Sequence, residues 1–319
     1  MLKLSHQPVL LTETLDALNL QTDGIYIDCT YGRGGHTQAI LSQLGPTGQI
    51  LALDQDPEAV QFAQFIKDKR FNIVHNTFTQ LQTNIEKRGW LGQVNGILLD
   101  LGVSSPQLDN PTRGFSFMQD GPLDMRMNPD IGESVAQWLD TATATEIAKV
   151  LKDYGEERYA NRIARAIKAE SVTTTGQLAN IVTKACPPNK EHKHPATRSF
   201  QALRIFINRE LEQLQQVLIQ TLNVLAPNGR LVVICFHSLE DRIVKRFMRD
   251  NARGDKFPIN LPVTVEQLNP KLRIINKPIR AKQTEINSNP RARSAILRVS
   301  ELTDFQKNKK SEEKNTIGS

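Results

Sequence analysis

Residues 24–37 read GIYIDCTYGRGGHT, a run of apolar and β-favouring residues that leads into a glycine-rich turn. After Thr37 the spacing is compatible with a helix as far as Leu44. The stretch therefore predicts a strand, a loop and a helix. Glycines let the main-chain N–H groups of such a loop approach a ligand closely. Turns of this kind also form for packing alone, so the loop by itself leaves both interpretations open.

A second apolar strand is predicted at residues 49–54, and it ends in Asp54. Pro57 then suits the first turn of a helix. In an open α/β sheet, an acid about 20 residues after the glycine loop accepts hydrogen bonds from ribose hydroxyls. The loop and Asp54 together indicate a cofactor that contains adenosine.

The rest of the chain extends this pattern and interrupts it once. Further strands are predicted at 71–75, 94–100, 229–236 and 294–299, and strands alternating with helices imply a parallel sheet covered on both faces. Between residues 134 and 214 the pattern is helical, with segments at 145–151, 159–167 and 203–218. We expect an α/β fold with an inserted helical subdomain. The expected domains are 1–106 with 215–302, the insert 107–214 and a flexible tail 303–319.

Composition limits the location and the partners. No apolar run approaches the roughly 20 residues of a membrane span, and the amino terminus does not resemble a signal peptide, so we expect a cytoplasmic protein. Cys29, Cys186 and Cys235 are too dispersed for a Cys-x-x-Cys metal pair, and no metal site is predicted. The net charge is +6, with a basic excess over residues 271–298. An anionic partner and a solvated basic surface both fit this excess.

The spacing of the glycines separates two classes of cofactor. The dinucleotide fingerprint needs Gly-x-Gly-x-x-Gly, and this loop has no third glycine at the required place. Residues 225–234 read LAPNGRLVVI, a helix end and a turn before a strand, which resembles the late part of class I methyltransferases. S-adenosylmethionine is therefore favoured over NAD, and no Tyr-x-x-x-Lys pair supports an NAD-linked oxidoreductase. The intact loop and Asp54 argue against an RNA-binding protein without catalysis.

Seven blocks, in order along the chain, closely resemble the bacterial ribosomal RNA small-subunit methyltransferase H family. They are residues 28–36, 96–109, 113–117, 121–127, 194–205, 236–242 and 289–294. The resemblance implies a Rossmann-like class I methyltransferase, an rRNA (cytosine-N4-)-methyltransferase that modifies a cytidine in the decoding region of 16S rRNA of the small ribosomal subunit. It implies cofactor contacts from Gly34, Gly35, His36, Asp54, Phe78, Asp100 and Gln107. Cys29 departs from the glycine expected in many relatives, without changing the class of cofactor.

The acceptor chemistry is less well specified by the sequence. An exocyclic cytosine amine is a poor nucleophile, so positioning should dominate catalysis. Ser104, Ser105 and Pro106 follow the fourth strand where amino methyltransferases position their acceptor, although an ordinary turn fits them equally well. The proton acceptor is not identified. His237 follows another strand end, where capping of the next helix competes with a role in the active site.

Basic residues supply candidate RNA contacts in the insert and near the carboxyl end. These candidates are Lys193, His194, Arg198, Arg204, Arg291 and Arg293. A solvated surface is the alternative for each of them. The sequence does not specify the oligomeric state.

Overall fold

A computed structural model of the 319-residue chain describes residues 8–187, 194–255, 257–258 and 264–304. The chain forms two compact units. The first, here called the sheet unit, comprises 1–102 and 213–319; the second, the helical unit, comprises 103–212. The predicted tail from 305 onward and Lys193 lie outside the described residues. No helix in the described ranges is long and apolar enough to cross a membrane.

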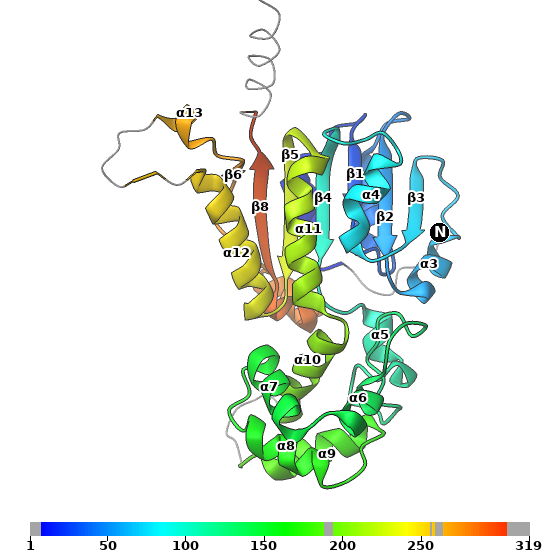
Figure 1. Cartoon of the computed structure of the whole chain (residues 1–319). Helices are drawn as coiled ribbons and strands as arrows, with labels where there is room; N and C mark the ends of the chain where they lie inside the picture. The colour runs from blue at the N-terminus through cyan, green and yellow to red at the C-terminus, as the bar shows by residue number, and fades with distance from the viewer. Residues whose placement is uncertain (1–7, 188–193, 256, 259–263, 305–319) are drawn as a thin grey trace, which may run out of the picture. The chain divides into compact units, whose positions relative to one another are not determined.

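The sheet unit is built on one mixed sheet with the strand order β3-β2-β1-β4-β5-β8-β6 (Figure 1). Its parallel strands are β1 (Ile25–Asp28), β2 (Gln49–Asp54), β3 (Phe71–His75), β4 (Val94–Asp100) and β5 (Leu225–Cys235). Strand β8 (Ile296–Leu302) runs antiparallel to β5, and both β6 (Leu272–Ile274) and β7 (Ile279–Arg280) pair with it. This is the class I methyltransferase arrangement, which confirms the predicted fold class.

Helices cover both faces of this sheet, and those on one face lie in front of the strands in Figure 1. Helices α1 (Leu11–Leu18), α2 (Gly35–Gln43) and α3 (Pro57–Ala63) pack on one face, and α4 (Leu81–Glu86), α11 (Glu210–Val224) and α12 (Ser238–Arg253) pack on the other. Successive side chains of a strand point to opposite faces of the sheet. Leu51 and Leu53 therefore pack in the core on one face, and Ile50 and Ala52 pack in the core on the other. Burial on both faces explains why the strands are continuous apolar runs.

Short elements complete the sheet unit. These are the 3-10 turns η1 (Phe78–Gln80) and η3 (Pro290–Ser294) and the helices α13 (Val265–Leu268) and α14 (Gln283–Ser288). The sequence patterns did not predict β6, β7 or these turns, because two- and three-residue strands carry no usable periodicity.

The helical unit has its own core. It contains α5 (Ser105–Asp109), η2 (Pro111–Arg113), α6 (Val135–Thr141), α7 (Ala144–Gly155), α8 (Ala160–Lys168), α9 (Thr175–Ala185) and α10 (Ala196–Ile207). Capping boxes at Ser134, Thr143 and Thr174 start α6, α7 and α9. Buried side chains such as Leu151, Ile163, Leu178 and Leu203 fill the interior.

The single helix predicted over residues 203–218 is wrong, because the chain breaks between α10 and α11. Arg209 adopts a left-handed φ of 51°, and the preceding Asn208 turns its side chain inward. Its Oδ1 accepts from Met127 N at 2.7 Å, and its Nδ2 donates to Met125 O at 2.8 Å. Asn208 thus satisfies the main chain of a distant loop, a tertiary contact that periodicity cannot reveal.

The turn predicted over residues 225–229 also differs. Strand β5 begins at Leu225 and passes through the Pro-Asn-Gly segment, with Asn228 at a φ of 62°. Its register against β4 shifts between Val94 and Gly96. The residues predicted to form a turn instead form a bulge within the strand. The strand therefore starts at Leu225, earlier than the predicted residue 229.

Candidate active site

The carboxyl ends of β1, β2 and β4 bring the predicted loop and acids to one edge of the sheet. In the parallel register, Asp28 of β1 lies beside Ala52 of β2 and Leu98 of β4. Thr30 Oγ1 accepts a hydrogen bond from Asp100 N at 2.7 Å, and Tyr31 N donates to Leu53 O at 3.2 Å. Ligands in open α/β sheets bind at this edge.

The glycine loop has conformations and contacts that only glycine fits. Gly34 has a φ of +72°, and a Cβ there would lie 2.6 Å from the Tyr31 ring. A Cβ on Gly35 would lie 2.3 Å from Pro8 Cγ. Packing therefore accounts for part of the glycine pattern. Helix α2 begins at Gly35, so its unpaired first amides face the same edge.

Asp54 is held by two main-chain amides. Its Oδ2 accepts from Gly32 N at 2.7 Å, and its Oδ1 accepts from Asp56 N at 2.9 Å. Burial raises the pKa of Asp54 to about 6, although both amide hydrogen bonds act to lower it. A carboxylate has about four acceptor positions, so two remain for donors such as the hydroxyls of a ribose.

Asp28 ties the two ends of the loop together, and the sequence analysis missed it. The side chain is 1% exposed; Oδ1 accepts from Thr30 N at 3.1 Å and Oδ2 from Thr37 Oγ1 at 2.7 Å. Burial raises the pKa of the Asp28 carboxyl. An acid at the end of an apolar strand, directly before a glycine loop, was the signal that could have identified it.

His36 and Asp100 face each other beside the loop. The distance from His36 Nε2 to Asp100 Oδ2 is 3.5 Å, and the imidazole is buried. Burial alone would lower the pKa of His36, but the nearby carboxylates of Asp100 and Asp28 outweigh it, so the pKa is raised. An imidazolium between two carboxylates would hold this corner of the loop together.

Four buried polar atoms of Tyr31, His36 and Asp100 have no hydrogen-bond partner among the described residues. They are Tyr31 Oη, both ring nitrogens of His36 and Asp100 Oδ1. Buried polar groups are normally satisfied, so unpaired ones at a ligand-binding edge indicate where a ligand supplies the partner. Together with the open acceptor positions of Asp54, these atoms fit a cofactor with a ribose and a polar amino-acid end.

Two further predicted cofactor contacts differ in how the structure places them. Phe78 starts η1 after β3, half-buried, and packs against the core on the α11 face. Gln107 belongs to the helical unit, where it is buried and its Oε1 accepts from Ser104 N at 2.9 Å. Its contact with the cofactor stays a prediction.

The predicted acceptor-positioning segment begins a helix. Ser104 is the N-cap of α5, and Ser105 and Pro106 form its first turn. The preference of serine and proline for a helix start accounts for these residues locally. Their role toward an acceptor stays a prediction.

The candidate RNA-binding residues differ in their exposure and in their contacts within the chain. In the helical unit, His194 is exposed and stacks on Phe117 with 4.6 Å between ring centroids, and Arg198 is exposed. Arg204 forms a bidentate ion pair with Glu210, with N–O distances of 2.8 and 2.9 Å. Its positive charge therefore stabilises the junction between α10 and α11. In the sheet unit, η3 carries half-buried Arg291 and exposed Arg293.

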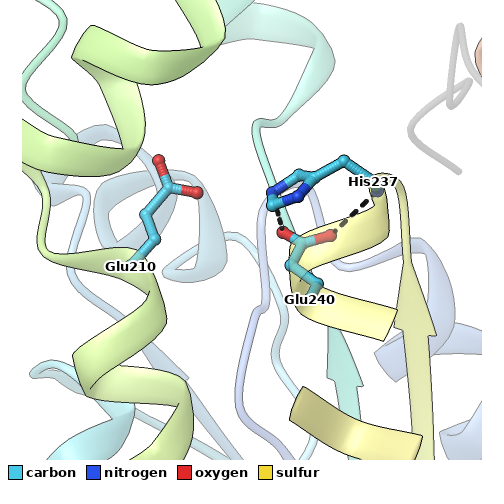
Figure 2. Close-up of side chains that lie close together, drawn as sticks. All are labelled: Glu210, His237 and Glu240. Atoms are coloured by element: carbon cyan, nitrogen blue, oxygen red, sulfur yellow. Dashed lines mark hydrogen bonds and ion pairs between the residues drawn. The ribbon is translucent and has the colours of Figure 1, made fainter. Parts of the chain in front are cut away.

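His237 caps helix α12, which favours the structural interpretation of this residue. Figure 2 shows the Glu240 carboxylate reaching both the His237 ring, at 3.0 Å, and the His237 main chain, at 3.3 Å. The same carboxylate accepts from Phe236 N at 2.8 Å. Glu240 is thus the N3 partner in a capping box. Asp241 forms an ion pair with Arg298 at 2.6 Å.

Two solved structures with a similar fold are only weakly similar to this chain. A "putative rRNA-methylase" from Clostridium thermocellum is 12% identical, with a TM-score of 0.44 over 93% of this chain and 99% of the other. A SAM-dependent O-methyltransferase from Thermotoga maritima is 9% identical, with a TM-score of 0.40 over 93% of this chain and 67% of the other. At TM-scores below 0.5, these likenesses support neither an activity nor a substrate for this chain.

Comparison with models of protein families identifies the family of this chain. The model of the MraW methylase family matches residues 3–303, nearly the whole chain. This is the family that the seven sequence blocks resemble, so the predicted resemblance is confirmed. A methylase of this family with a class I sheet uses S-adenosylmethionine as its cofactor. The NAD alternative is excluded on the same grounds.

Proposed function

The chain belongs to the MraW methylase family, and on that premise we propose that it is a cytoplasmic enzyme that methylates N4 of a cytidine in the decoding region of 16S rRNA. The substrate would be rRNA within the small ribosomal subunit. The observation that carries this proposal is the joint placement of the glycine loop, Asp54 and Asp100 at one sheet edge.

We assign each part of the cofactor to residues of this chain. Asp54 would accept the ribose hydroxyls, Phe78 would contact the adenine, and the amides at Gly34 and Gly35 would contact the amino-acid end. The unpaired Oδ1 of Asp100 would lie toward the sulfonium end and favour its positive charge. When bound, S-adenosylmethionine supplies an electrophilic methyl group on a positively charged sulfur.

The acceptor nitrogen needs positioning more than activation. Its lone pair is delocalised into the cytosine ring, so catalysis gains most from holding it in line with the methyl group. Ser104, Ser105 and Pro106 are our candidates for this positioning. One N4–H proton is lost as the N–CH3 bond forms, and its acceptor is left unassigned.

RNA binding is proposed for the exposed basic residues. His194 and Arg198 in the helical unit and Arg293 in the sheet unit present polar or charged groups to solvent. Arg204 is the weakest candidate, because breaking its ion pair with Glu210 would cost part of the energy gained from a phosphate. Lys193 and Arg291 complete the proposed set.

The proposal is tested by methyl transfer from labelled S-adenosylmethionine to isolated ribosomal subunits. We expect incorporation into small subunits from cells that lack this methylation, and none into large subunits. Protein-free 16S rRNA run in parallel shows whether assembly is required. Incorporation only into large-subunit RNA, or into protein alone, would rule out the proposed substrate.

A further inference from the structure

The outward side of α12 is strongly basic. Its exposed basic side chains are Arg242, Lys245, Arg246, Arg249 and Arg253, here called the α12 basic face. The residues 242, 246, 249 and 253 are spaced four, three and four apart, so they lie along one side of the helix. Val244 and Met248 on the other side are buried in the core against the sheet. The geometry of the sheet unit therefore turns this row of charge to solvent.

The acids of the helix do little to neutralise this face. Glu240 is buried and bonded to the main chain of residues 236 and 237, and Asp241 is bonded twice to Arg298. Asp250 pairs with Arg249 at 2.8 Å, but both side chains are largely exposed, so this pair is weak. Within the described part of the chain, no ion pair involves Lys245, Arg246 or Arg253.

Ordinary solvation does not explain the concentration of charge. Helix α11 covers the same face of the sheet, and its exposed residues Gln215, Gln216, Ile219 and Asn223 are all uncharged. The helix dipole favours cations only in the last turn, which accounts for Arg253 but not for Lys245 or Arg246. An anionic partner would account for this concentration of charge.

Arginine predominates on this face, and this favours phosphate. A guanidinium offers a planar set of donors that matches two phosphate oxygens at once, whereas lysine provides only a point charge. From Arg246 to Arg253 the helix rises about 10 Å, which spans a few successive phosphates of a nucleic-acid strand. We infer that the α12 basic face binds the phosphate backbone of the RNA substrate. This inference rests on the proposed function, which supplies the RNA.

The test compares two full-length variants that each remove two positive charges. Arg246→Gln/Arg253→Gln alters the α12 basic face, and Lys67→Gln/Lys69→Gln alters two exposed lysines between α3 and β3 in the same unit. Binding of a fluorescein-labelled 16S rRNA fragment is followed by fluorescence anisotropy across a series of KCl concentrations. Calorimetry with S-adenosylmethionine checks that both variants keep the cofactor site.

Each phosphate contact contributes about 0.7 to 0.9 to the slope of log affinity against log salt. Arg246→Gln/Arg253→Gln should therefore lower the slope by about 1.6 and weaken binding about twentyfold at about 0.15 M KCl. The lysine variant should behave like the unmodified chain, and cofactor affinity should be unchanged in both. This combination supports a phosphate-binding α12 face.

Other outcomes overturn the inference in distinguishable ways. Equal RNA affinity in the two variants would contradict the inference alone, because the proposed function does not depend on the α12 basic face. Co-sedimentation of both variants with intact small subunits is measured beside the anisotropy. If Arg246→Gln/Arg253→Gln binds the free fragment normally but no longer binds the subunits, the partner is a ribosomal protein, which also contradicts the inference. Failure of the unmodified chain to bind the free fragment at low salt would contradict the inference, whereas the proposed function is tested separately by methyl transfer to small subunits.

Discussion

The carboxylate of Asp28 accepts a hydrogen bond from Thr37 Oγ1 at 2.7 Å, and this bond joins the two ends of the glycine loop. Asp28 ends β1 and Thr37 lies in the first turn of α2, both of them buried. The loop between them supplies the amide that positions Asp54. The shape of the loop that holds Asp54 therefore depends on a hydrogen bond that makes no contact with Asp54 itself.

Replacing Thr37 with valine should destabilise the fold. Valine keeps the volume but removes the hydroxyl donor to a buried carboxylate, which costs about 1 to 3 kcal/mol of unfolding free energy. Urea denaturation measures the loss. Thr47→Val, an exposed threonine in the α2–β2 connection, is the control and should change stability by less than about 0.5 kcal/mol. Equal losses of unfolding free energy in the two variants would show that the Asp28–Thr37 hydrogen bond does not stabilise the fold more than an exposed threonine does.

Gly34→Ala should impair both stability and cofactor binding. The left-handed backbone alone costs an alanine about 1 kcal/mol, and the Tyr31 ring 2.6 Å from the new Cβ must also move. Gly89 has a similar φ of +69° and open space around it, so Gly89→Ala isolates the backbone cost. We expect denaturation to show the larger loss for Gly34→Ala. If both variants lose the same stability, the ring contact is unimportant.

Asp54→Ala should weaken S-adenosylmethionine binding by about 1 to 3 kcal/mol, the scale of a lost hydrogen bond to a charged group. Isothermal titration calorimetry measures the change. Asp16→Ala, at an exposed acid on α1, is the charge-matched control and should bind the cofactor normally. Unchanged affinity in Asp54→Ala would contradict the ribose role.

The cofactor affinity should also depend on pH through Asp54. Ribose hydroxyls donate to the ionised carboxylate, whose pKa is raised to about 6. Binding should therefore weaken as the pH falls through about 6, and Asp54→Asn, which cannot titrate, should lose this component. The effect on folding has the opposite sign. Because the folded pKa exceeds the unfolded value, stability from Asp54 is fully present below about pH 4 and is lost as the pH rises through about 6. Stability curves for the chain and Asp54→Asn that are parallel between pH 4 and 7 would contradict the raised pKa.

Asn208→Ala should destabilise the helical unit. It leaves Met127 N and Met125 O without their buried side-chain partner, at a cost of about 1 to 3 kcal/mol. Asn161→Ala on the exposed side of α8 is the matched control and should be near neutral. Circular dichroism during urea denaturation distinguishes the two variants, and an equal response would mean that the α10–α11 break does not depend on Asn208.

The elements that the sequence predicted well are those with local signals. The apolar strands at 49–54 and 94–100, the glycine loop and Asp54 each follow from neighbouring residues, and the structure places them as expected. The break at Asn208 depends on a loop about 80 residues away, and the bond between Asp28 and Thr37 joins two side chains on opposite sides of the glycine loop. Such contacts leave no periodic trace, since a single side chain carries each of them. The α12 basic face was overlooked because its charges alternate with core residues.

The central claim is N4 methylation of a 16S rRNA cytidine, and nucleoside analysis of the methylated product tests it most directly. Small subunits methylated by the unmodified chain are digested to nucleosides and separated by liquid chromatography with mass spectrometry. We predict labelled N4-methylcytidine within the decoding region, and less of it with Asp54→Ala at limiting cofactor. Label in 5-methylcytidine, in another base or on the ribose would contradict the account.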